Sequence, residues 1–193
     1  YLFIGLLLWV ALVGRALWPV LRGPSTDSKA IIALLFASTA AIGLFFGAAL
    51  MWGEHTHISE VEYWRWWLVH LWVEGFFEVF ATAVIALIFT SLGLIHARTA
   101  NTAIVMETTV FLFGGILGTL HHLYFTGAPT SVIALGAVFS ALEVVPLALV
   151  GIEGYRTYLR SKAAPWVANY RWPILFFVAV GFWNTVGAGL LGF

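Results

Sequence analysis

Long apolar runs separated by short polar loops dominate the order of residues in this chain. A helix needs about 20 predominantly apolar residues to cross the hydrocarbon core of a bilayer. Six segments meet this requirement, at roughly 1–21, 30–52, 62–95, 102–126, 130–157 and 171–193. The third is long enough to tilt or to project from the membrane. The pattern therefore predicts an all-α, polytopic membrane helix bundle of about six transmembrane helices, with neighbouring spans antiparallel because the loops are short.

Composition supports this fold class and excludes several classes of function. The chain has 193 residues, of which 62% are hydrophobic and only 9% charged, whereas a soluble domain carries about 25% charged residues. We expect one transmembrane domain over residues 1–193, with the lipid bilayer as its surroundings. Net charge is zero and no basic block is present, so nucleic acid is not expected as a partner. The absence of cysteine excludes thiolate metal sites, iron–sulfur clusters and covalent c-type haem attachment.

Both ends of the sequence lie in apolar runs. Tyr1 precedes an apolar stretch and Phe193 ends one. We expect the chain to be the middle part of a longer membrane subunit.

The charges of the loops predict the orientation of the spans, because lysine and arginine concentrate on the cytoplasmic side. The second loop is acidic or neutral and the fourth is uncharged, whereas the first, third and fifth are basic. The basic loops carry Arg15, Arg22, Lys29, His96, Arg98, Arg156, Arg160, Lys162 and Arg171. The odd-numbered spans should therefore run inward from the outer side.

Four ionisable side chains fall at spacings that allow them to converge within the membrane. His70 and Glu74 share one helix face of the third span. His70 lies about 12 Å below the start of that span, at ~1.5 Å per residue. His121 and His122 lie about one turn from the outer end of the fourth span, at a similar depth. Ionisable groups are costly in lipid, and imidazole nitrogens with one carboxylate suit iron, copper or zinc. We therefore predict a metal site of His70, Glu74, His121 and His122.

Two further acidic residues lie near this predicted site. Glu78 is one turn inward of Glu74, and Glu143 is near the middle of the fifth span. Pro146 cannot donate a hydrogen bond to the Leu142 carbonyl, so we expect the backbone beside Glu143 to be loosened or kinked. Glu143 could be a neutral acid bonded to a carbonyl or a proton carrier.

Other polar, aromatic and glycine positions are interpreted as structural. Trp66 belongs to a group of aromatic residues that is typical of a membrane interface. Gly114 and Gly118 form a small-residue motif that permits close helix packing. Glu107 and the Asn184-Thr185 pair are interpreted as helix-packing contacts rather than as parts of a pathway.

The polar motifs resemble those of a known enzyme family. The segments His70-Leu71-Trp72-Val73-Glu74-Gly75, His121-His122 and Phe139-Ser140-Ala141-Leu142-Glu143, with Glu78 between the first two, resemble the large subunit of bacterial nitric oxide reductase. That enzyme is part of the haem–copper oxidase superfamily. The segments Tyr170-Arg171-Trp172-Pro173 and Phe182-Trp183-Asn184 look more like its quinol-dependent, single-chain branch.

The resemblance implies an activity and roles for individual residues. It implies reduction of two nitric oxide molecules to N2O and water at a haem b3–non-haem iron (FeB) centre, with electrons from quinol, or from cytochrome c in the other branch. His70, His121 and His122 match the FeB histidines, and Glu74 matches the carboxylate that completes the site. Glu74, Glu78 and Glu143 match the acidic residues of catalysis and proton supply.

The same resemblance implies what this chain does not contain. The family binds haem b and haem b3 through histidines on other spans, so their axial ligands are expected outside residues 1–193. The implied location is the bacterial cytoplasmic (inner) membrane, with oligomerisation left open. Three alternatives stay open at this point: a terminal oxygen reductase of the same superfamily, an intramembrane metal or proton transporter, and a non-catalytic relative that has lost haem.

Overall fold

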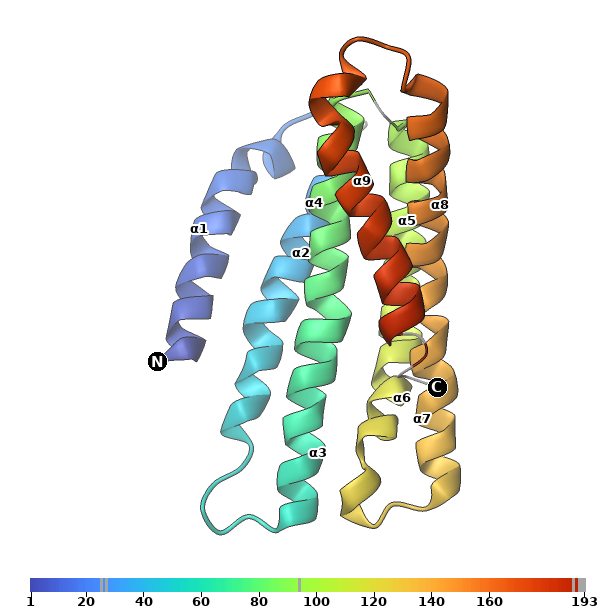
Figure 1. The fold of residues 1–193 in the computed structure, drawn as a ribbon. Coiled ribbons are helices and arrows are strands. Elements are labelled where there is room, and N and C mark those ends of the chain that lie inside the picture. The colour runs from blue at the N-terminus through green and yellow to red at the C-terminus, as the bar shows by residue number, and fades with distance from the viewer. Residues whose placement is uncertain (25, 27, 94, 189, 191–193) are drawn as a thin grey trace.

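The computed structural model describes residues 1–193 except 25, 27, 94, 189 and 191–193. Its described residues are helical or lie in loops and turns, without strands. The helices run up and down in an elongated bundle (Figure 1). This arrangement confirms the predicted all-α membrane bundle.

The helices follow the predicted spans closely. The first two spans are α1 (Leu2–Arg22) and α2 (Lys29–Phe45), which continues as the 3₁₀ segment η1 (Phe46–Leu50). The third span joins α3 (Ile58–Val69), the π-helical η2 (His70–Phe77) and α4 (Glu78–Ser91). The fourth joins α5 (Ala97–Val110), the π-helical η3 (Phe111–Gly115), α6 (Ile116–Gly118) and the 3₁₀ segment η4 (Thr119–His122). After η5 (Tyr124–Thr126), the fifth joins α7 (Thr130–Leu142) and α8 (Val144–Ser161).

Among the described residues, five helices are long and apolar enough to cross a membrane, covering Leu2–Arg22, Lys29–Leu50, Ile58–Ser91, Ala97–His122 and Thr130–Ser161. The predicted sixth span, 171–193, corresponds to α9 (Val167–Trp183) and the π-helical η6 (Asn184–Ala188). This helix begins four residues earlier than predicted, and the predicted end of the span lies outside the described residues. The third span is 34 residues long, as its apolar run indicated.

Helix packing places the apolar core between α2, α4 and α5, and between α4 and α9. Ile31, Ala83 and Ile104 are fully buried in the first of these clusters. Phe89 and Phe177 pack edge to face in the second. Helix α1 contacts α2 and lies at the edge of the bundle (Figure 1). It has no buried residue, so most of its apolar surface is left uncovered by the other described helices.

The fifth span breaks at Glu143, where the proline predicted a loosened backbone. Helix α7 ends at Leu142 and α8 begins at Val144. The Glu143 N–H donates to the Ser140 carbonyl at 3.1 Å, as in a tighter turn. Pro146 is buried in the first turn of α8, where its missing N–H is best tolerated. Glu143 therefore lies between the two helical segments of this span.

Candidate metal centre

His70 is the most deeply buried member of the cluster, with no exposed surface. It begins the π-helical segment η2 of the third span. Such π-helical turns are rare and frequently occur at functional sites. Its Nδ1 lies 2.9 Å from Oε2 of Glu74, and 3.3 Å from Nε2 of His122. The i, i+4 pairing that the sequence predicted is therefore present, on a widened helix that the sequence pattern did not reveal.

His121 and His122 lie in η4, the single 3₁₀ turn that ends the fourth span. Their Nε2 atoms are 2.9 Å apart. The His122 ring stacks on the Trp66 indole at 4.2 Å between centroids, with the planes 3° apart. Trp66 in turn donates from Nε1 to Oε2 of Glu62 at 3.0 Å. An aromatic residue interpreted from sequence as an interfacial anchor thus orients one of the histidines.

The four donor atoms have the separations expected around one ion. One donor from each of His70, Glu74, His121 and His122 lies within 4.8 Å of all the others. Glu74 Oε2 is 3.5 Å from His122 Nε2. Ligands bound at about 2.0–2.1 Å to one ion, at tetrahedral or octahedral angles, lie about 2.9–3.4 Å apart. Four of the six separations, at 2.9–3.5 Å, fit this requirement, and all six lie within 4.8 Å, so these residues could hold a metal with three nitrogens and one carboxylate oxygen.

Glu143 lies behind His70, on the side away from the other donors. Its Oε1 is 3.6 Å from Nε2 of His70. Within the described part of the chain, neither of these two buried atoms has a hydrogen-bond partner. The ring nitrogen that does not bind metal commonly faces a carboxylate, which fixes the orientation of the ring. Glu143 is therefore placed to orient His70 rather than to join the donor set.

Glu78 lies one turn further along the third span. Its Oε1 accepts a hydrogen bond from Nδ2 of Asn184, 106 residues away, at the start of η6. Asn184 therefore links the last helix to the third span through Glu78. This contact agrees with the structural role that the sequence indicated for Asn184.

Three glycines allow the elements of the site to approach closely. A Cβ at Gly118 would lie 2.9 Å from Nε2 of His70, and a Cβ at Gly115 would lie 3.2 Å from Oε1 of Glu143. A Cβ at Gly136 would overlap the backbone N of His121, so α7 can pack against η4 only with a glycine there. Gly118 belongs to the motif interpreted from sequence as helix packing, and its empty side faces the site itself.

These observations define a class of protein: a polytopic helical membrane protein with an intramembrane cluster of three histidines and one glutamate. The family described as "Cytochrome C and Quinol oxidase polypeptide I" matches residues 1–193, and the chain belongs to this family. The resemblance to the haem–copper oxidase superfamily is thereby confirmed. This membership favours an oxidoreductase over the transporter alternative.

A curated relative points to one branch of the superfamily. A nitric oxide reductase subunit from Stutzerimonas stutzeri is 30% identical to this chain over 158 residues. The match covers 80% of this chain and 32% of the relative, so the chain spans about a third of the length of that protein. Dependence on quinol stays a prediction.

Proposed function

We propose that this chain is the FeB-binding part of a nitric oxide reductase that takes its electrons from quinol in the bacterial inner membrane. The reaction joins two NO molecules, two electrons and two protons into N2O and water. Nitric oxide, quinol and the lipid bilayer would be its partners, with cytochrome c as the alternative electron donor. Non-haem iron, haem b and haem b3 would be the cofactors of the complete protein.

The observation that carries this proposal is the presence of Glu74 in the donor set. Its Oε2 lies 2.9 Å from Nδ1 of His70, within the group that could surround one ion. A hard carboxylate oxygen favours iron over Cu(I), which prefers soft ligands. An iron site supports NO reduction rather than the copper chemistry of the oxygen reductases. The name of the Stutzerimonas stutzeri relative points in the same direction.

The residues of this chain have separate tasks in this proposal. His70, His121 and His122 hold the iron, and Glu74 adds a negative charge that should lower the reduction potential of the site. When bound, the iron and haem b3 supply the electron transfer and the Lewis acidity. Glu143 orients His70 from behind, and Glu78 and Glu143 hold or pass protons near the site.

The burial of the cluster gives it one closed and one open side. The His70 side chain is 1% exposed, whereas that of Glu74 is 43% exposed in this chain. An accessible side next to the carboxylate would give room for substrate. NO is small and uncharged, so the apolar spans around the site do not oppose its entry from lipid.

A terminal oxygen reductase is the second candidate, because the matched family is described by its oxidases. The complete protein should be purified, its haem spectrum recorded, and its uptake of NO and of O2 measured on the same preparation with a quinol donor. We expect rapid NO uptake with N2O as product. Rapid O2 uptake without NO uptake would establish the second candidate, and a preparation without haem would contradict both.

A further inference from the structure

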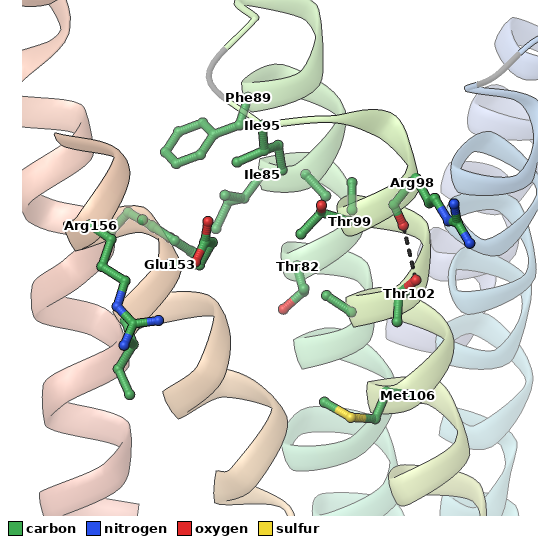
Figure 2. A pocket seen from close by; sticks show the side chains of 16 residues that line it. Thr82, Ile85, Phe89, Ile95, Arg98, Thr99, Thr102, Met106, Glu153 and Arg156 are labelled. Atoms are coloured by element: carbon green, nitrogen blue, oxygen red, sulfur yellow. Dashed lines mark hydrogen bonds between the residues drawn. The ribbon is translucent and has the colours of Figure 1, made fainter. Parts of the chain in front are cut away.

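A cavity of about 510 Å³ lies between α4, α5, α8 and α9, beyond Thr82 on the side away from the histidines. Figure 2 shows Thr82 and Thr99 on one side of this space and Glu153 and Arg156 on the other. A water molecule takes up roughly 30 Å³ in the liquid and needs polar partners to stay in a protein interior. The cavity is large enough to hold water, and these side chains are polar partners that could bind it. Arg98, in the first turn of α5, and Arg156, in the last turns of α8, also line the cavity, and they lie toward the loops that the charge pattern places in the cytoplasm.

Thr82 connects this cavity to a buried acid. Its hydroxyl donates to Oε1 of Glu107 at 2.8 Å, from α4 to α5. Thr82 is 4% exposed and Glu107 is 1% exposed. Oε2 of Glu107 is buried and has no hydrogen-bond partner among the described residues. This oxygen could therefore bind a proton, and the threonine that bonds the acid also lines the cavity.

A row of polar side chains leads from Thr82 to the metal centre. His70, Glu74, Glu78 and Thr82 follow one another at every fourth position of the third span. Side chains four residues apart on a helix are neighbours, with Cβ atoms about 5–6 Å apart. The row runs from the cavity to the donor set through α4 and the π-helical η2.

We propose that Glu107 and Thr82 form a proton-holding site, through which protons from the cavity reach Glu78 and the metal centre. The proposal rests on the proposed function in one respect, since it requires a reaction at the centre that consumes protons. It replaces the interpretation of Glu107 as a packing contact, because packing alone explains neither the unpartnered Oε2 nor the cavity beside Thr82.

The transfer changes no covalent bond other than O–H and moves no electron. A hydronium ion in the cavity gives a proton to the Thr82 hydroxyl and becomes water, while the hydroxyl passes its own proton along its hydrogen bond to the Glu107 carboxylate. The Glu107 carboxyl then gives a proton to Glu78, by way of the Thr82 hydroxyl, and returns to the carboxylate. Two such transfers supply the two protons of the proposed reaction.

The test compares variants of the complete protein in which the shape of the site is preserved. Glu107→Gln removes the proton-binding oxygen, Thr82→Val removes the bridging hydroxyl, and Thr82→Ser keeps it. Thr109→Val is the matched control, because the Thr109 hydroxyl is exposed on α5 and bonds only the Val105 carbonyl. Non-haem iron, haem spectra, steady-state turnover and its slowing in D2O are measured for each variant.

We expect Glu107→Gln and Thr82→Val to lower turnover about ten- to a hundredfold. This loss is at or below the smallest rate acceleration that is typical of a positioned proton-transfer group. Iron and haem should stay at wild-type levels, the solvent isotope effect should increase, and Thr82→Ser and Thr109→Val should keep near-normal turnover. Should Glu107→Gln fail to assemble, Thr82→Val and Thr82→Ser decide the question alone.

Wild-type turnover in Glu107→Gln or Thr82→Val would overturn the proton route and leave the proposed function intact. Oxygen uptake in place of NO uptake by the wild-type protein would instead overturn the proposed function. Oxygen reduction also consumes protons. The turnover of each variant relative to the wild type would therefore still test the proton route. If a variant is slowed but its solvent isotope effect is unchanged, Glu107 is a packing residue and not a proton-holding one.

Discussion

Gly118 is a position at which the smallest covalent change should disturb the centre directly, through the side chain of His70. An alanine Cβ there would lie 2.9 Å from Nε2 and 3.3 Å from Cε1 of His70, and 3.3 Å from the backbone N of Ser140. Non-bonded carbon contacts are most favourable at about 3.5–4.0 Å. The imidazole must therefore move by about 0.6 Å or more, because the Ser140 backbone prevents relief on the other side.

The displacement of His70 should affect function more than stability. Misplacing a reacting group by about 1 Å can cost a hundredfold in rate, so we expect Gly118→Ala to lower turnover about ten- to a hundredfold. Overpacking costs about 1–3 kcal/mol in well-packed interiors, which should leave the protein folded. Turnover, non-haem iron content and the EPR spectrum of the iron site are measured in the complete protein.

Gly47→Ala is the matched control for this prediction. A Cβ at Gly47 meets the Phe3 ring at 3.5 Å, which is an ordinary contact. It should leave turnover and iron content unchanged. The reasoning would be refuted if Gly118→Ala kept wild-type turnover and an unaltered iron spectrum.

Three further predictions concern the carboxylates. Glu74→Gln removes a negative charge from the donor set, so a redox titration should give a higher midpoint potential for the non-haem iron; an unchanged potential would exclude Glu74 as a ligand. Glu143→Gln should slow turnover while both haem spectra stay intact, and loss of haem would show a structural role instead. Asn184→Leu and Glu78→Gln should be non-additive in thermal stability, because the two side chains share one hydrogen bond; strictly additive effects would speak against that bond.

The sequence predicted the spans, and the structure brings the four predicted donor residues together. Lipid tolerates few ionisable side chains, so His70, Glu74 and His121-His122 were conspicuous in their apolar runs. The same reasoning located the break beside Glu143, because Pro146 lacks the N–H that a continuous helix requires.

The sequence could not reveal contacts between distant spans. The π-helical segment that begins at His70 is only eight residues long, so the periodicity of apolar residues along the span does not signal it. The stacking of Trp66 on His122 and the bond from Thr82 to Glu107 depend on how separate helices pack. Close approach at Gly118 was visible only as a small-residue motif, which is common in membrane helices.

Non-haem iron in the complete protein tests the central claim most directly, by comparing the wild type with His121→Ala and with His55→Ala. His121 belongs to the donor cluster, whereas His55 is exposed in the loop before α3. We predict one non-haem iron per wild-type protein molecule, the same amount in His55→Ala, and loss of most of it in His121→Ala. Full retention of this iron in His121→Ala would contradict the assignment of the metal centre.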